Sequence, residues 1–184
     1  MKKFHKGEQG YIDYKKKVQT IIVISFVLAG LSLFFICKWI LGTGRNLGTV
    51  VAVLLTLPAA KALVNLILFL PHRSTDITLW EKAEAIRKDD DKMYYDLVFT
   101  SEQSTMHLDA LCARGNELIA YSKDGAKQEK ILSYFTDSMK KRGVGVHMHI
   151  FRNEESFLQR MQDCNEDGPV PEEITEFIRM ILVS

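Results

Sequence analysis

The chain has 184 residues, of which 47% are hydrophobic, and its 24 Lys and Arg nearly balance its 23 Asp and Glu for a formal net charge of +1. These averages hide two different parts, because residues 18–70 are almost entirely apolar whereas the sequence from residue 72 onward is polar. The three cysteines have neither the spacing of a metal site nor that of a disulfide framework, which argues against a disulfide-rich or zinc-stabilised small domain.

Charge is distributed as unevenly as hydropathy. Residues 1–17 contain six lysines against two acids, a net charge of +4, and the apolar stretch adds three cations. Residues 72–184 hold 15 Lys and Arg against 21 Asp and Glu, a net charge of −6. Because nucleic-acid binding depends on dense Lys and Arg contacts, this acidic part argues against nucleic acid as a partner.

Two apolar runs, residues 18–41 and 47–70, dominate the N-terminal part of the chain. Each is longer than the roughly 20 residues with which a helix crosses a bilayer core of about 30 Å. The five residues between them, 42–46, are too few to return through lipid, so the runs predict an antiparallel hairpin of two transmembrane helices. The first run is too long for a signal-peptide core and has no Ala-x-Ala cleavage pattern. The alternative is a buried hairpin in a soluble core, which a chain of this length could not cover.

The lysines predict the orientation of this hairpin. Six of them precede the first span, while the connecting turn offers only Arg45, with Lys38 just before it. By the positive-inside rule, both termini lie in the cytoplasm. We therefore expect a multi-pass protein of the cell membrane, with a basic cytosolic tail at 1–17, a transmembrane hairpin at 18–70 and a cytosolic domain at 75–184.

Two features make the hairpin a candidate for more than anchoring. Ser25, Ala29 and Ser32 share one face of the first helix, and small faces let membrane helices pack closely, either within the hairpin or between copies in a homo-oligomer. Lys61 carries a charge into the second run, with Asn65 one turn further on the same face. These two residues indicate either an ion or substrate path in an oligomeric transport accessory or, as we favour, a lysine whose stem reaches the headgroups.

The periodicities of residues 75–184 predict one α/β domain. The expected elements are a helix to about residue 88, strands at 93–100, 105–113 and 117–122, a helix to residue 142, a strand at 144–151 and two short helices. The crossover between the third and fourth strands predicts that they are parallel. Alternation along the second strand predicts one shared face for Met106, Leu108, Ala110 and Cys112. The order α-β-β-β-α-β-α-α therefore predicts a four-stranded mixed sheet flanked by helices.

One stretch of this domain carries a family resemblance. Asp109 falls on the second strand, and Lys123 follows the third. Together with the α-β-β-β-α-β order of residues 76–151, this spacing resembles the PD-(D/E)xK nuclease-like fold, which implies a divalent metal held by two acids beside a scissile phosphate. Asp109 matches the first acid and Lys123 the lysine, but Tyr121 replaces the second acid, and a phenol is a poor ligand for Mg²⁺. The resemblance implies a membrane-tethered phosphodiesterase or an inactive relative.

His147 and His149 are a second candidate site. They alternate on the fourth strand and so point to one face, where His-x-His can bind zinc or copper with His107 or Asp109 as a neighbour. The alternative is a polar outer face of the sheet.

The layout as a whole also resembles an uncharacterised class of small bacterial two-span membrane proteins with a cytosolic α/β domain, a resemblance that implies no activity. We found no intact catalytic set and no motif that binds a cofactor. The sequence therefore favours a non-enzymatic module that binds a protein partner or senses a ligand at the cytoplasmic face of the membrane.

Overall fold

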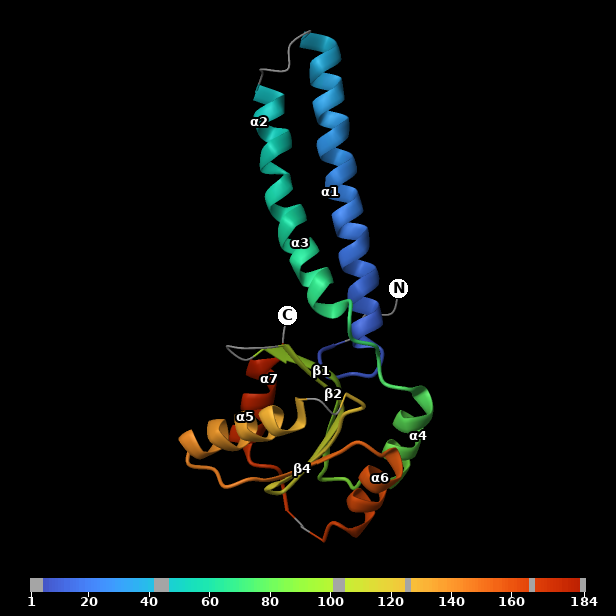
Figure 1. Cartoon of the computed structure of the whole chain (residues 1–184), viewed down its shortest axis with the longest axis vertical. Coiled ribbons are helices and arrows are strands. Elements are labelled where there is room, and N and C mark those ends of the chain that lie inside the picture. Colours follow the sequence, from blue (N-terminus) through green and yellow to red (C-terminus); the bar gives the residue numbers. More distant parts are fainter. Residues whose placement is uncertain (1–4, 42–46, 101–104, 125–126, 166–167, 183–184) are drawn as a thin grey trace. The chain divides into compact units, whose positions relative to one another are not determined.

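The structure, a computed structural model, describes residues 5–41, 47–100, 105–124, 127–165 and 168–182. The chain divides into two compact units, which are Met1–Tyr11 with Ser74–Ser184 and Ile12–Arg73. The first unit contains the sheet and the second is helical (Figure 1). Each is described by itself below.

The helical unit is built around α1, Tyr11–Leu41. Its first 30 residues form a helix that is long and apolar enough to cross a membrane. The helix begins seven residues before the predicted start at residue 18, because lysine is a good helix former and Asp13 lies favourably in the first turn. The cluster Lys15–Lys17 therefore belongs to the helix rather than to a tail.

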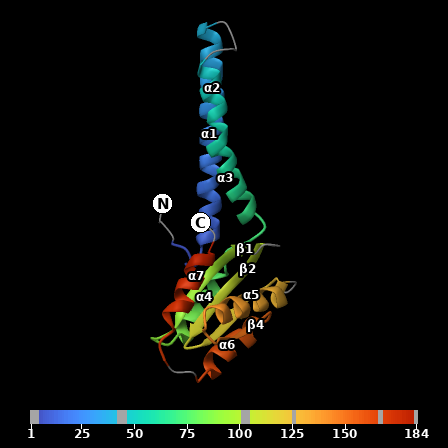
Figure 2. The ribbon, with the colours of Figure 1, turned by 90° about the vertical axis from the view of Figure 1, so that its left-hand side faces the viewer.

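The second apolar run is divided into α2, Leu47–Leu54, and α3, Thr56–Phe69, which run alongside α1 (Figures 1 and 2). The prediction of one continuous helix over residues 47–70 is wrong. Pro58 has no N–H to donate to the carbonyl four residues earlier, so helical bonding is interrupted in the preceding turn. The predicted turn at 42–46 lies outside the described residues.

The α/β domain contains the predicted order of elements. These are α4 Ile77–Ile86, β1 Lys92–Thr100, β2 Thr105–Arg114, β3 Glu117–Tyr121, α5 Gln128–Lys141, β4 His147–Phe151, α6 Glu154–Asp163 and α7 Glu172–Ile181. The strands lie in the order β1-β2-β3-β4. The first three are antiparallel neighbours, and β4 is parallel to β3. The predicted four-stranded mixed sheet is confirmed.

Helices cover both faces of this sheet, with α4 and α6 on one side and α5 and α7 on the other (Figure 1). Each helix turns its periodic apolar stripe to the strands, which gives two separate apolar layers. The α5–α7 layer includes Ile131, Phe135, Met139, Ile174, Phe177 and Ile178. The α4–α6 layer includes Leu79, Ala83, Phe157 and Met161.

Strand β1 changes faces at one residue. Tyr95 packs in the α4–α6 layer, whereas Leu97, two positions further on, packs in the α5–α7 layer. Between them, Asp96 has a φ of 53°, in the left-handed region that Asp adopts more readily than most residues. The turn of the chain at Asp96 shifts the alternation of β1 by one residue.

Strand β2 changes faces opposite this point, because Tyr95 pairs with Ala110 and Leu97 with Leu108. The prediction that alternate residues from 106 to 112 share one face of β2 is therefore wrong. Met106 and Leu108 belong to the α5–α7 layer, and Ala110 and Cys112 belong to the α4–α6 layer.

Asp96 also joins two distant segments of the chain. Its Oδ1 accepts a hydrogen bond from the backbone N–H of Thr75 at 2.6 Å, and its Oδ2 accepts one from the N–H of Gly10 at 2.9 Å. Next to it, the N–H of Tyr95 donates to the carbonyl of Gly7 at 2.8 Å. The segment that immediately precedes α1 was predicted to be part of a basic tail, but it is part of the α/β domain.

Gly7→Ala is expected to destabilise the domain by about 1–2 kcal/mol, because residue 7 has a left-handed φ. In addition, the new Cβ would lie 3.2 Å from Tyr94 Cδ1. Urea denaturation of the purified full chain, followed by circular dichroism, measures the effect. Gly145→Ala is the control, since residue 145 has open space and lacks a positive φ. Equal stability of the two variants would show that the segment before α1 does not support the domain.

Candidate functional site

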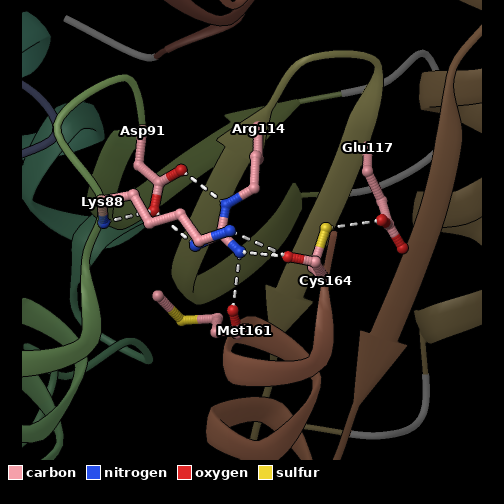
Figure 3. Close-up of polar contacts among 6 residues, drawn as sticks. All are labelled: Lys88, Asp91, Arg114, Glu117, Met161 and Cys164. Carbon is pink, nitrogen blue, oxygen red and sulfur yellow. Dashed lines mark hydrogen bonds and ion pairs between the residues drawn. The ribbon is translucent and has the colours of Figure 1, made fainter. Parts of the chain in front are cut away.

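A buried ion pair lies at the edge of the α4–α6 layer (Figure 3). Arg114, the last residue of β2, donates from Nε to Asp91 Oδ1 at 2.7 Å and from Nη2 to Asp91 Oδ2 at 2.6 Å. Neither side chain is more than 2% exposed. Burial opposes the negative charge of Asp91, but the hydrogen bonds and charge of Arg114 outweigh it and hold the pKa of Asp91 below its usual range.

The remaining donors of Arg114 hold the end of α6. Its Nη1 donates to the carbonyl of Met161 at 2.7 Å and to the carbonyl of Cys164 at 2.9 Å. The Nζ of Lys88 donates to the same carbonyl of Cys164 at 3.2 Å. Helix C-termini leave carbonyls without helical partners and favour nearby cations, so these contacts fix the position of Cys164.

On its other side, Cys164 contacts Glu117, the first residue of β3. The Cys164 thiol donates to Glu117 Oε2 at 2.8 Å, and Arg160 Nη2 donates to Oε1 of the same carboxylate. The Nε2 of His149 lies 3.5 Å from Oε1. Glu117 is only 5% exposed, and burial raises its pKa. The thiol hydrogen bond and Arg160 act more strongly in the other direction, so the pKa of Glu117 is lowered and the carboxylate is ionised at neutral pH.

Glu117 and Cys164 are the buried members of an open polar pocket of about 540 Å³. Its lining consists of Glu117, His147, His149, Arg160, Asp163, Cys164 and Asn165. The structure therefore places both predicted histidines at one site and adds a carboxylate, a guanidinium and a thiol to them.

The pocket has several groups that ligate metals, but their arrangement is that of an ion-pair network. Among the described residues, no three His, Cys, Asp or Glu side chains are placed to hold a metal ion. The Glu117 carboxylate accepts hydrogen bonds from Arg160 and from the Cys164 thiol. The positively charged guanidinium of Arg160 is bound to Oε1, the oxygen nearest to His149, and so takes the position that a metal ion would need.

Asp109 and Lys123, the two residues of the nuclease-like resemblance, contact each other through the backbone. Asp109 Oδ2 accepts from the N–H of Lys123 at 2.8 Å, which stabilises the turn after β3. Burial, followed by the charges of Asp109, Glu154 and Asp76, raises the pKa of Tyr121. Tyr121 stands in place of the second acid, and it is a neutral phenol at physiological pH.

The helical unit leaves the predicted small face uncovered. On α1, the cleft toward the second apolar run is lined by Phe26, Gly30 and Phe34, among others. Ser25, Ala29 and Ser32 are exposed instead. These three residues are not among those that line that cleft, and pairing through the small face, within the hairpin or between copies, stays a prediction.

Lys61 and Asn65 both lie on α3. Lys61 is exposed and Asn65 is half-buried. Their one-turn spacing places them near each other on the helix surface, and both readings, a polar path or a lysine that extends toward the headgroups, stay predictions.

Comparison of the chain with protein-family models, with curated proteins and with solved structures finds no match. The α-β-β-β-α-β order that resembles the nuclease-like fold is present, but no family match accompanies it. Function is therefore inferred below from the geometry of the chain's own side chains.

The residues that sequence reasoning missed are the charged members of the network. Asp91 ends a run of three acids, which is typical of a solvated loop, and Arg114 precedes a Gly-Asn turn. Glu117 is the first residue of a short strand directly after that turn, a position where an exposed polar residue is ordinary, so the sequence does not indicate that it is buried. The available signal was Arg114 itself, a charge directly after the apolar sequence Leu111–Ala113.

Asp91→Asn is expected to lower the free energy of unfolding by about 3–5 kcal/mol at pH 7, because it leaves the buried Arg114 guanidinium without its carboxylate. The folded-state pKa of Asp91 lies below its usual value. The ion pair therefore stabilises the fold above the ordinary pKa of about 3.9 and loses this effect as the pH falls through the lower folded value. Urea denaturation at neutral and acidic pH should show that the difference in the free energy of unfolding between Asp91→Asn and the wild type becomes smaller on acidification.

The matched control for this experiment is Asp90→Asn, which removes an exposed carboxylate from the neighbouring position. It should have the stability of the wild type at both pH values. If Asp91→Asn is as stable as this control at pH 7, the ion pair does not hold the domain together.

Proposed function

We propose that this chain is a multi-pass protein of the cell membrane whose α/β domain is a non-enzymatic binding or sensing module at the cytoplasmic face. The observation that carries the proposal is the pocket of about 540 Å³ around Glu117. It presents a carboxylate, a guanidinium and two imidazoles to an open space, which suits a polar ligand or the side chains of a partner protein.

The membrane part of the proposal rests on uncovered apolar surface. Large apolar side chains are exposed along α1 and along the α2–α3 pair. Contiguous exposed surface of this kind requires a cover of lipid or protein. The 8 residues of α2 and 14 of α3, with Leu55 between them, extend about 35 Å at helical rise, so the second run is also long enough to cross.

The contacts of Asp96 support two crossings rather than one. Gly10, which immediately precedes α1, and Thr75, which follows α3, bond to the same carboxylate. The chain before α1 and the chain after α3 must therefore lie on the same side of any membrane. If α1 crosses, the α2–α3 pair has to return. The lysines at the start of α1 favour the cytoplasm as that side.

The chemistry of the pocket supports recognition over catalysis. A general base works best with a pKa near the working pH, whereas the pKa of Glu117 is lowered by the Cys164 thiol and Arg160. An ionised carboxylate with a lowered pKa is a weak proton acceptor and a good hydrogen-bond acceptor. Asp109, the other candidate for chemistry, is occupied by the backbone of Lys123.

The network behind the pocket supports a sensing role. Cys164 contacts Glu117 through its thiol and Arg114 through its carbonyl, so it belongs to both the pocket and the buried ion pair. A ligand that moves Glu117 or Arg160 also changes the forces on the end of α6. The pocket is therefore connected to the interior of the domain by hydrogen bonds.

A test is to purify the tagged full chain from solubilised membranes and to identify what accompanies it. We expect a stoichiometric partner protein or a second copy. Asn165→Trp, which fills the exposed side of the pocket and leaves Glu117 untouched, should reduce this recovery about tenfold, as expected when a bulky group blocks a contact worth about 1.4 kcal/mol.

The matched control is Lys140→Trp, which adds the same side chain at an exposed position of α5 on the other face of the sheet. It should retain the partner, and both variants should have the melting temperature of the wild type. Recovery of neither a partner nor a second copy with the wild-type chain would overturn the proposal, and so would equal recovery with both variants.

A further inference from the structure

We propose that the first turn of α4 rests in the membrane, with Ile77 and Trp80 inserted at the boundary between headgroups and acyl chains. This inference rests on the membrane anchor proposed above, and it adds a second lipid contact made by the α/β domain itself.

Helix α4 exposes two large apolar side chains near its start. Ile77 is 61% exposed and Trp80 is 37% exposed, while Leu79 and Ala83 on the inner face are buried. Ile77 and Trp80 are three positions apart, so they are neighbours on the helix surface. Neither Ile77 nor Trp80 belongs to the α4–α6 layer, to which the inner face contributes Leu79 and Ala83.

Single exposed apolar residues are common, so the position of this pair in the chain carries the argument. Thr75, two residues before Ile77, is buried and bonded to Asp96, which also binds Gly10. From Gly10 to Val18, where the apolar run begins, the chain rises only about 12 Å in helical form. The headgroup region on one side of a bilayer is about 5–8 Å deep. The start of α4 is thus tethered within a short distance of the lipid.

The side chains suit that environment. Tryptophan favours the membrane interface, because its ring is apolar and its indole N–H can still bond to water or headgroups. The exposed acids Asp76 and Glu81 flank the pair, so attraction to anionic lipid is not the driving force. The occupant that fits is therefore a zwitterionic lipid surface, which Ile77 and Trp80 enter by burial of apolar area.

The chain has two tryptophans, and this makes the test direct. In the full chain, Trp39→Phe leaves Trp80 as the reporter of α4, and Trp80→Phe leaves Trp39 as the reporter of α1. Each variant is reconstituted in phosphatidylcholine vesicles that carry bromine at a shallow or a deep acyl position. We expect shallow bromine to quench Trp80 about twofold and deep bromine to quench it less, as for an interfacial residue.

Ile77→Asp in the Trp39→Phe background should abolish this quenching, because the charge opposes insertion of the turn. Leu132→Asp is the control, since Leu132 is also an exposed apolar residue, 39% against 61% for Ile77, and lies on α5; it should leave the quenching unchanged.

The outcomes separate this inference from the anchor. If Trp39 is quenched and Trp80 is not, the anchor stands and the lipid contact of α4 is overturned. If neither is quenched, the anchor fails, and the inference fails with it. If Trp80 responds to the ratio of protein to lipid and not to bromine, a second copy of the chain covers α4, which also overturns the proposal.

Discussion

A guanidinium with almost no access to water must find acceptors for its donors inside the protein. Arg114 finds them in the Asp91 carboxylate and in the carbonyls of Met161 and Cys164. The loop before β1, the end of β2 and the C-terminus of α6 are held in one arrangement by this single side chain. Because apolar residues of similar volume can be as stable as a buried ion pair, the contribution of Arg114 lies chiefly in this geometry, which also aims the Cys164 thiol at Glu117.

Asp96 is a second buried carboxylate with a comparable role. Its left-handed backbone conformation reverses which face of the sheet the following residues of β1 point to. Its side chain accepts hydrogen bonds from two segments of the chain. The two acids act at different places in the domain. Asp91 binds Arg114 behind the pocket, and Asp96 binds the two segments through which the chain enters and leaves the helical unit. Both depend on hydrogen bonds that apolar periodicity does not reveal.

The order of elements, the parallel pairing of β3 with β4 and the apolar stripe of α5 could be predicted, because each follows from local periodicity or from chain connectivity. The change of faces at Asp96 could not, since residues 93–95 and 97–99 are all apolar or aromatic, and the sequence has no alternation there that would mark the shift. The docking of Gly7 and Gly10 was also hidden, because both act through backbone groups that every residue has. At the pocket, the two histidines were visible by their spacing, but Arg160 and Cys164 belong to α6 and its C-cap, and their contact with Glu117 of β3 is a tertiary contact that spacing does not reveal.

The bond between Gly10 and Asp96 has a consequence for how the protein is made. It joins residues 86 positions apart, with the whole helical unit between them. Gly10 leaves the ribosome long before its acceptor exists, and closing so long a loop carries an entropic cost that grows with its length. Within the helical unit, the α2–α3 pair runs alongside α1, so the chain turns back on itself before Asp96 is made. In biosynthesis the helical unit is therefore made before the first strand of the α/β domain can be completed.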